Sequence, residues 1–246
     1  MRHITEDDNI SSKEIKNLLI FVGVFCALFT AFLLYITVIY TIYDFLVIMG
    51  LAFFGTVPAF LANAFMPIVG SIKKLPSTPV DGGKTLNGKR IFGEGKTWKG
   101  FIGGILLGFL TSYILSVLIY PKLYEITVVF MADGSVLEFI TTEGILFFVD
   151  TQTDPVAFHL RTLLLCVGAP LGDLVGSFTK RRMDRPRGSQ VFVIDQIDFI
   201  AVSVLLAYPV FPLAWPYIVF LLVFSPLITV AANVLSYYIG AKQVPW

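Results

Sequence analysis

Long apolar runs restrict this chain more than any other feature of its sequence. Six of these runs approach the roughly 20 residues that a helix needs to cross a bilayer. A helix satisfies its own backbone hydrogen bonds inside lipid, whereas an open strand does not. The sequence therefore predicts an all-α polytopic membrane protein of about six transmembrane helices, at approximately 18–41, 45–70, 100–120, 157–178, 196–213 and 215–239.

The composition and the distribution of charge support this interpretation. Hydrophobic residues make up 56% of the chain and charged residues only 14%, against about 25% charged residues in an average soluble domain. With six crossings, all of the 18 lysines and arginines except Lys122 and Arg161 fall on one side. The positive-inside rule predicts that both termini and the basic loops 71–99 and 179–195 face the cytoplasm of a cell membrane. We expect no nucleic-acid partner.

The segment 121–156 differs from the rest of the chain and is predicted to lie outside the membrane on the other side. It contains β-branched and aromatic runs on either side of Asp133-Gly134. Asp-Gly between such runs is a strong signal for a hairpin. We expect a small extracytoplasmic β-hairpin here, and a passive decoration of the fold is the simplest explanation for it.

Three aspartates are predicted to meet at the cytoplasmic membrane face. Asp195 and Asp198 begin the fifth apolar run and share one face of a helix, and capping of the helix N-terminus is an alternative explanation for them. Capping does not explain Asp173, which lies near the C-terminal end of the fourth run, where the helix dipole disfavours a carboxylate. A metal ion held by Asp173, Asp195 and Asp198 would remove this conflict.

Basic residues follow the fourth run directly, at positions 180–182, 185 and 187. Alone, such a cluster is typical of a cytoplasmic loop or of a surface that binds lipid headgroups. Beside carboxylates that hold a metal, it becomes suited to polyphosphate. We assign catalytic roles to Asp173, Lys180, Arg181 and Asp195.

A glycine-rich segment, residues 78–100, forms most of the first basic loop. Glycines let backbone N–H groups approach an anion closely, although the spacing is not that of a Walker A loop. A flexible basic linker is the alternative. Asn63, a polar residue inside the second run, either bonds another helix or faces a cavity. The residues predicted to bind substrates are Asn63, Asp81, Lys84, Arg90, Lys96, Lys99 and Arg182.

Glycines recur at every fourth position in two of the apolar runs. Residues at this spacing let membrane helices pack closely. If the two helices that carry these rows pack on each other, the cytoplasmic loops at their ends come together. The rows are Gly100, Gly104 and Gly108, and Gly168, Gly172 and Gly176.

Several ordered motifs resemble the CDP-archaeol synthase family, which is related to the phosphatidate cytidylyltransferases. They are LANAFMPIVG, TPVDGGKTLNGKRIFGEGKTWKGFIGG, GDLVGSFTKRR, IDQIDF and the terminal QVPW. The resemblance covers roughly residues 55–120 and 160–246. It implies a catalytic membrane domain of five helices at 46–120 and 157–246. Residues 1–45, a tail with an extra helix, and the insertion 121–156 are departures from the family.

The resemblance also implies an activity. The family transfers a cytidylyl group from CTP to 2,3-bis-geranylgeranyl-glycerol 1-phosphate, giving CDP-archaeol and pyrophosphate, and it requires Mg²⁺. By the same resemblance, Asp173 and Asp195 are the leading metal ligands and Asp198 supports them. Lys180, Arg181 and Arg182 match the basic part of the family motif.

Three alternative functions share some of these sequence features. A diacyl phosphatidate cytidylyltransferase would use the same headgroup chemistry with different lipid tails. A CDP-alcohol phosphotransferase is disfavoured, because Asp81-Gly82 is followed by Gly83-Lys84 instead of Ala-Arg. A transporter with an ion site at Asp173 is disfavoured too, because the chain shows no second broken helix to match the one at Pro170.

Overall fold

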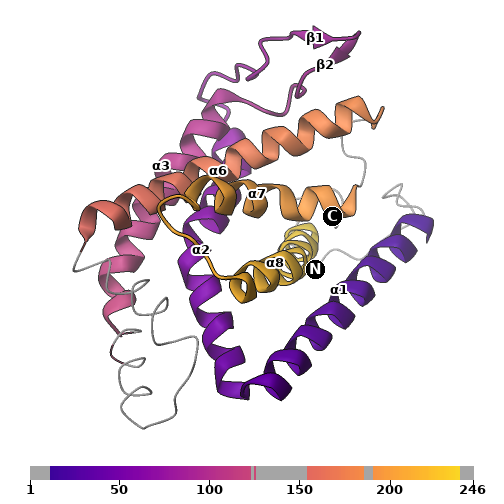
Figure 1. Ribbon diagram of the computed structural model, residues 1–246. Coiled ribbons are helices and arrows are strands. Elements are labelled where there is room, and N and C mark those ends of the chain that lie inside the picture. Colours follow the sequence, from indigo (N-terminus) through magenta and orange to yellow (C-terminus); the bar gives the residue numbers. More distant parts are fainter. Residues whose placement is uncertain (1–11, 123–124, 126–153, 186–190, 239–246) are drawn as a thin grey trace.

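The computed structural model describes residues 12–122, 125, 154–185 and 191–238 (Figure 1). Within these ranges the protein is a bundle of long helices with one small sheet. The elements are α1 (Ser12–Ile39), α2 (Ile42–Gly70), β1 (Thr85–Leu86), β2 (Lys89–Arg90), α3 (Trp98–Leu118), α6 (Pro155–Arg182), α7 (Phe192–Ala207) and α8 (Trp215–Tyr238). The predicted class, an all-α polytopic membrane protein, is confirmed.

Every predicted apolar run forms a helix, but one of these helices is short. Five helices are long and apolar enough to cross a membrane: α1, α2, α3, α6 and α8. The fifth predicted run, 196–213, contains most of α7, which has 16 residues and ends at Ala207. Pro209 lies two positions after Ala207, and a helical conformation is disfavoured for Tyr208, the residue before the proline. At 1.5 Å per residue, α7 is about 24 Å long, less than the bilayer core.

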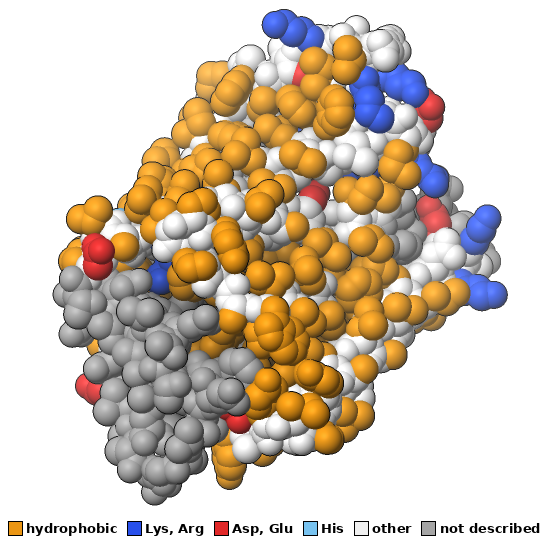
Figure 2. Space-filling view, viewed as in Figure 1, with side chains coloured by type: hydrophobic (Ala, Val, Ile, Leu, Met, Phe, Trp, Pro, Cys, Tyr) orange, Lys and Arg blue, Asp and Glu red, His pale blue; other side chains and the backbone are white. Residues whose placement is uncertain are grey.

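The central element of the bundle is α2, which contacts all five of the other described helices, α1, α3, α6, α7 and α8. Its buried side chains include Phe45, Ile48 and Ala59, and they pack with residues of α6, α7 and α8 such as Leu165, Phe199 and Phe220. The outer surface is apolar. Figure 2 shows hydrophobic side chains over the broad middle of one face, with lysines and arginines gathered toward its margins. This surface fits contact with lipid.

The two glycine rows face different helices, and not each other. A methyl group at Gly104 or Gly108 would meet Met66 or Ala62 of α2. One at Gly168 or Gly172 would instead meet the backbone of α7, at Ser203 or Asp198. Each row therefore gives a close approach to a neighbour in the bundle. The loops at the ends of α2 and α6 come together nonetheless, through polar contacts described below.

The small sheet lies inside the glycine-rich segment. β1 and β2 are antiparallel, and Thr85 pairs with Arg90 and Leu86 with Lys89. Asn87 and Gly88 connect them with φ angles of 50° and 75°, the conformation for which Asn-Gly is favoured in two-residue hairpins. Sequence analysis did not identify this hairpin. The hairpin predicted within 121–156 lies almost entirely outside the described residues.

Candidate active site

An ion pair joins the glycine-rich segment to α6. Lys96 Nζ lies 2.6 Å from Asp173 Oδ1. The backbone around Lys96 is fixed, because its carbonyl accepts a hydrogen bond of 2.8 Å from the N–H of Val80. The next residue, Thr97, is the N-cap of α3. Lys96 is therefore held at the start of one helix and aimed at the carboxylate of another.

A second ion pair joins α6 to α7. Lys180 Nζ lies 2.8 Å from Asp195 Oδ1. The other carboxylate oxygen of Asp195 accepts a hydrogen bond of 3.2 Å from the N–H of Val191, the N-cap residue of α7. The capping explanation for Asp195 is thus correct for one of its oxygens. Oδ1 is buried and accepts no hydrogen bond from any described residue, so its one close partner is the charge of Lys180.

The third aspartate, Asp198, lies directly on the glycine row of α6. A methyl group at Gly176 would collide with its Oδ2. Its Oδ1 accepts a hydrogen bond of 2.6 Å from the N–H of Phe199. Asp198 also interacts electrostatically with Asp173, Lys96 and Asp195. The structure thus brings together three aspartates and two lysines from α6, α7 and the glycine-rich segment, and we call these five residues the Asp–Lys cluster.

The Asp–Lys cluster remains open to a polar ligand. The four side chains in its two ion pairs are between 20% and 30% exposed. Both lysines are therefore partly accessible, whereas Asp198 lies against the glycine row of α6.

The three aspartates fit Mg²⁺ in donor chemistry. In the part of the chain that the structure describes, no three His, Cys, Asp or Glu side chains form a ready cage for a metal ion. Mg²⁺ usually takes one or two carboxylates and completes its shell with water and substrate phosphates. The partly exposed carboxylates of Asp173 and Asp195 suit that mode, and in this structure each of them faces a lysine ammonium. Metal binding by Asp173, Asp195 and Asp198 stays a prediction.

Asp81 organises the glycine-rich segment from its interior. Its side chain has no exposed surface, and it accepts hydrogen bonds from the N–H groups of Gly83, Phe92 and Gly93 at 2.9 to 3.1 Å. The guanidinium of Arg90 donates two more, at 2.7 and 3.2 Å. Burial of the carboxylate opposes its ionisation. The Arg90 guanidinium and the three N–H groups outweigh burial and hold the pKa of Asp81 well below its usual value.

Several other predicted substrate ligands bind the protein's own backbone in this structure. Lys99 donates to the carbonyls of Ile72 and Leu75, which follow the last residue of α2. Arg182 donates to three carbonyls of the β1–β2 hairpin. Arg181, which the sequence analysis assigned a catalytic role, likewise donates to a backbone carbonyl, that of Arg185, at 2.7 Å.

Two predicted ligands have side chains without a partner among the described residues. Lys84 is exposed beside the hairpin. Asn63 is half-buried on α2. Both remain available to a substrate, whereas Asp81 and Arg90 are occupied with each other. Sequence analysis predicted that Asp81 binds substrate, whereas its side chain holds the glycine-rich segment together. Two features of the sequence could have indicated this structural role: the two glycines that follow Asp81 and the arginine nine residues later.

Comparison with known proteins places this arrangement in a family. The family model "CarS-like: CDP-archaeol synthase" matches residues 42–155 and 149–246. The CDP-archaeol synthase of Thermococcus kodakarensis is 40% identical over 196 residues, which are 79% of this chain and 95% of that protein. The corresponding protein of Thermococcus onnurineus is 39% identical with the same coverage.

A solved structure of an intramembrane enzyme for archaeal membrane lipid biosynthesis has the same fold. It superposes with a TM-score of 0.52 at 24% identity, and the match covers 74% of this chain and 92% of that one. The match of the family model includes all five residues of the Asp–Lys cluster and the whole glycine-rich segment. The chain belongs to the CDP-archaeol synthase family.

Proposed function

We propose that this protein transfers a cytidylyl group from CTP to 2,3-bis-geranylgeranyl-glycerol 1-phosphate, giving CDP-archaeol and pyrophosphate, and that the Asp–Lys cluster is where the transfer occurs. Membership of the family makes the protein a CTP-dependent cytidylyltransferase of ether-lipid synthesis. The observation that carries the site assignment is the convergence of Lys96 and Lys180 on Asp173 and Asp195.

The chemistry requires little from the side chains beyond charge and position. An oxygen of the lipid phosphate forms a bond to the α-phosphorus of CTP. The bond from that phosphorus to the bridging oxygen of pyrophosphate breaks, and its electron pair leaves with pyrophosphate. The lipid phosphate is already a nucleophile, so the barrier comes from repulsion between two anions and from charge on the leaving group.

Lys96 and Lys180 would lower this barrier. Each ammonium is already oriented by an aspartate, and cations fixed before the reaction stabilise developing charge without reorganisation. Mg²⁺, when bound by Asp173, Asp195 and Asp198, would supply further neutralisation of phosphate charge. The glycine-rich segment, with Lys84 exposed on it, would lie against the triphosphate and place this cation beside it.

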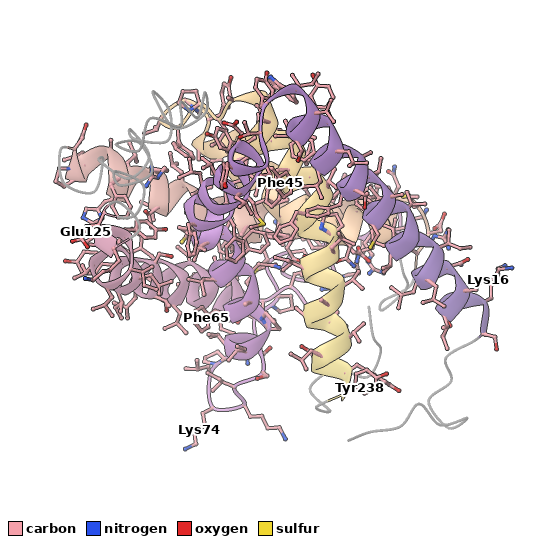
Figure 3. The ribbon with its side chains drawn as sticks, turned by 90° about the horizontal axis from the view of Figure 1, so that it is seen from below. Lys16, Phe45, Phe65, Lys74, Glu125 and Tyr238 are labelled. Carbon is pink, nitrogen blue, oxygen red and sulfur yellow. The ribbon has the colours of Figure 1, made fainter. Side chains whose placement is uncertain are left out.

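The protein is a multi-pass membrane protein, and we place its active site on the cytoplasmic side. The positive-inside distribution supports this orientation. In Figure 3, Lys74 after α2 and Tyr238 at the end of α8 lie toward one end of the bundle, and Phe45 at the start of α2 lies toward the other. CTP would enter from that cytoplasmic end, and the isoprenoid tails from the bilayer between helices.

The test uses purified protein with CTP labelled at the α-phosphate, Mg²⁺, and one of two acceptors, the geranylgeranyl ether phosphate or diacyl glycerol phosphate. Label in the ether CDP-lipid, released pyrophosphate and full inhibition by EDTA would support the proposal. Label only in the diacyl product would overturn the lipid assignment and keep the reaction. Folded protein that labels neither acceptor, and retains a labelled substrate in proteoliposomes, would favour a transporter.

A further inference from the structure

The guanidinium of Arg182 holds the β1–β2 hairpin against the end of α6. One terminal nitrogen donates to the carbonyl of Leu86 at 2.8 Å, and the other donates to Lys89 and Arg90 at 3.2 and 2.8 Å. The same guanidinium lies 5.1 Å from the ring centroid of Phe178, one helical turn earlier on α6. Three of the five N–H groups of the guanidinium are thus engaged by the hairpin, and the Nε atom is buried, so the hairpin occupies most of its capacity to bind a phosphate.

In the part of the chain that the structure describes, few other contacts attach the hairpin to the helices. Its ladder contains two residue pairs, and an isolated two-stranded hairpin is marginally stable in water. The other tie is the ion pair of Lys89 with Asp184, 2.5 Å long, in which the Asp184 side chain is 75% exposed. Exposed pairs of this kind contribute about 0–1 kcal/mol. Among the described residues, Arg182 is therefore the main direct attachment of the hairpin to α6.

A chain of hydrogen bonds and ion pairs leads from Arg182 to the Asp–Lys cluster. Arg182 binds the carbonyl of Arg90, and the Arg90 guanidinium binds Asp81. The residue before Asp81, Val80, donates to the carbonyl of Lys96, whose ammonium meets Asp173. Asp173 and Arg182 both belong to α6, so this one helix grips the glycine-rich segment at two points nine residues apart.

We propose that Arg182 is a positioning residue for CTP: it fixes the glycine-rich segment over the Asp–Lys cluster before the nucleotide arrives, and it does not itself bind phosphate. The statement that the segment receives CTP rests on the proposed function. Gly82, Gly83 and Gly93 have positive φ angles and no side chains, so a triphosphate can come close to the segment, while their own N–H groups hold its shape from within. Without the attachment, CTP must order the segment as it binds, and that cost weakens binding.

Arg182→Lys and Arg182→Gln separate a positioning role from a ligand role. Lysine keeps the positive charge but cannot span three carbonyls with a planar fork, and glutamine keeps two donors without charge. Positioning predicts that both variants raise the KM for CTP about tenfold, with kcat at saturating CTP nearly unchanged. If Arg182 instead bound phosphate, Arg182→Lys would keep much of the affinity for CTP and Arg182→Gln would lose it. The kcat would then fall in Arg182→Gln, which lacks the charge.

Hydrogen exchange without any substrate provides a readout that does not depend on activity. The amides of residues 84–93 should exchange at least tenfold faster in both variants, while those of α2 and α8 stay protected and show that the bundle is folded. Asp184→Asn, which breaks only the exposed tie, should change neither exchange nor KM more than about twofold. Unchanged exchange at 84–93 in both Arg182 variants would overturn the positioning role. Wild-type protein that makes no CDP-lipid would refute the proposed function, and the exchange result would still decide whether Arg182 fixes the hairpin.

Discussion

The ammonium of Lys96 lies 2.6 Å from the carboxylate of Asp173, across a sequence separation of 77 residues. This contact closes the glycine-rich segment onto α6 and leaves a partly exposed cation in front of a carboxylate that we assign to metal binding. The sequence placed Asp173 near the C-terminal end of its helix, but α6 continues for nine residues beyond it to Arg182, and the ion pair explains how the aspartate is retained inside this helix. It also makes the lysine as important to the proposed chemistry as the aspartate.

Replacing Lys96 with methionine should lower turnover by about 10²–10³, the usual cost of removing one fixed donor to a developing negative charge. Methionine keeps the aliphatic stem, and Asp173 is partly solvated, so the melting temperature should change little. The measurement is CDP-lipid formation at saturating CTP together with thermal unfolding in detergent. Lys74→Met, an exposed lysine outside the Asp–Lys cluster, is the matched control and should retain full activity. Equal activity in the two variants would remove Lys96 from the mechanism.

The glycine row of α6 allows a second test, because two of its members face different parts of α7. A methyl group at Gly176 would meet the flexible carboxylate of Asp198, whereas one at Gly172 would meet the backbone of Asp198 and Phe199. Gly176→Ala should therefore displace the carboxylate and lower activity at least tenfold with the fold intact. Gly172→Ala should lower the free energy of unfolding by about 1–3 kcal/mol through overpacking.

The control for both variants is Gly50→Ala, because nothing lies within 4 Å of a methyl group there. Alanine is favoured over glycine inside a helix by up to about 1 kcal/mol, so this variant should be as stable as the wild type or more so. Thermal unfolding and CDP-lipid formation in parallel would separate the three substitutions. Full activity in Gly176→Ala would mean that the position of Asp198 is not critical.

Asp81→Asn should destabilise the glycine-rich segment by about 2 kcal/mol, since it removes charge from a buried acceptor of several hydrogen bonds. The effect depends on pH. The pKa of Asp81 is lower in the folded protein than in the unfolded chain, so its contribution is complete above the ordinary pKa of about 3.9. It is lost as the pH falls further, toward the lowered pKa.

The measurement for Asp81 is the difference in melting temperature between the wild type and Asp81→Asn. It should be constant from pH 7 to about pH 5 and shrink below about pH 4. A difference of zero at pH 7, or one that grows as the pH falls, would contradict the role of Asp81 as the organiser of the segment.

The helices were predictable because apolar runs of this length have few alternatives in lipid. The length of α7 was not predicted, because the apolar run continues past Pro209 to Leu213. The partners of the glycine rows could not be predicted either. Spacing shows that a helix packs closely, but it does not identify the neighbour, here α2 for one row and α7 for the other.

The aspartates of the site were predictable because a carboxylate in an apolar run requires a reason. The roles of the cations were harder. Lys99 and Arg182 bind backbone carbonyls, and Arg90 binds Asp81, because a glycine-rich segment needs internal partners to hold its shape. Sequence alone shows a positive charge near a site. Only the fold shows which charges are already engaged and which, like Lys84, remain exposed.

The most direct test of the central claim compares the wild type with Asp173→Asn in the transfer of label from CTP to the geranylgeranyl ether phosphate. We predict Mg²⁺-dependent formation of CDP-lipid by the wild type. The variant should be at least 100-fold slower, with an unchanged melting temperature, because asparagine keeps the shape and removes the charge that holds Lys96 and would bind the metal. Turnover by Asp173→Asn at the wild-type rate would contradict the assignment of the Asp–Lys cluster as the active site.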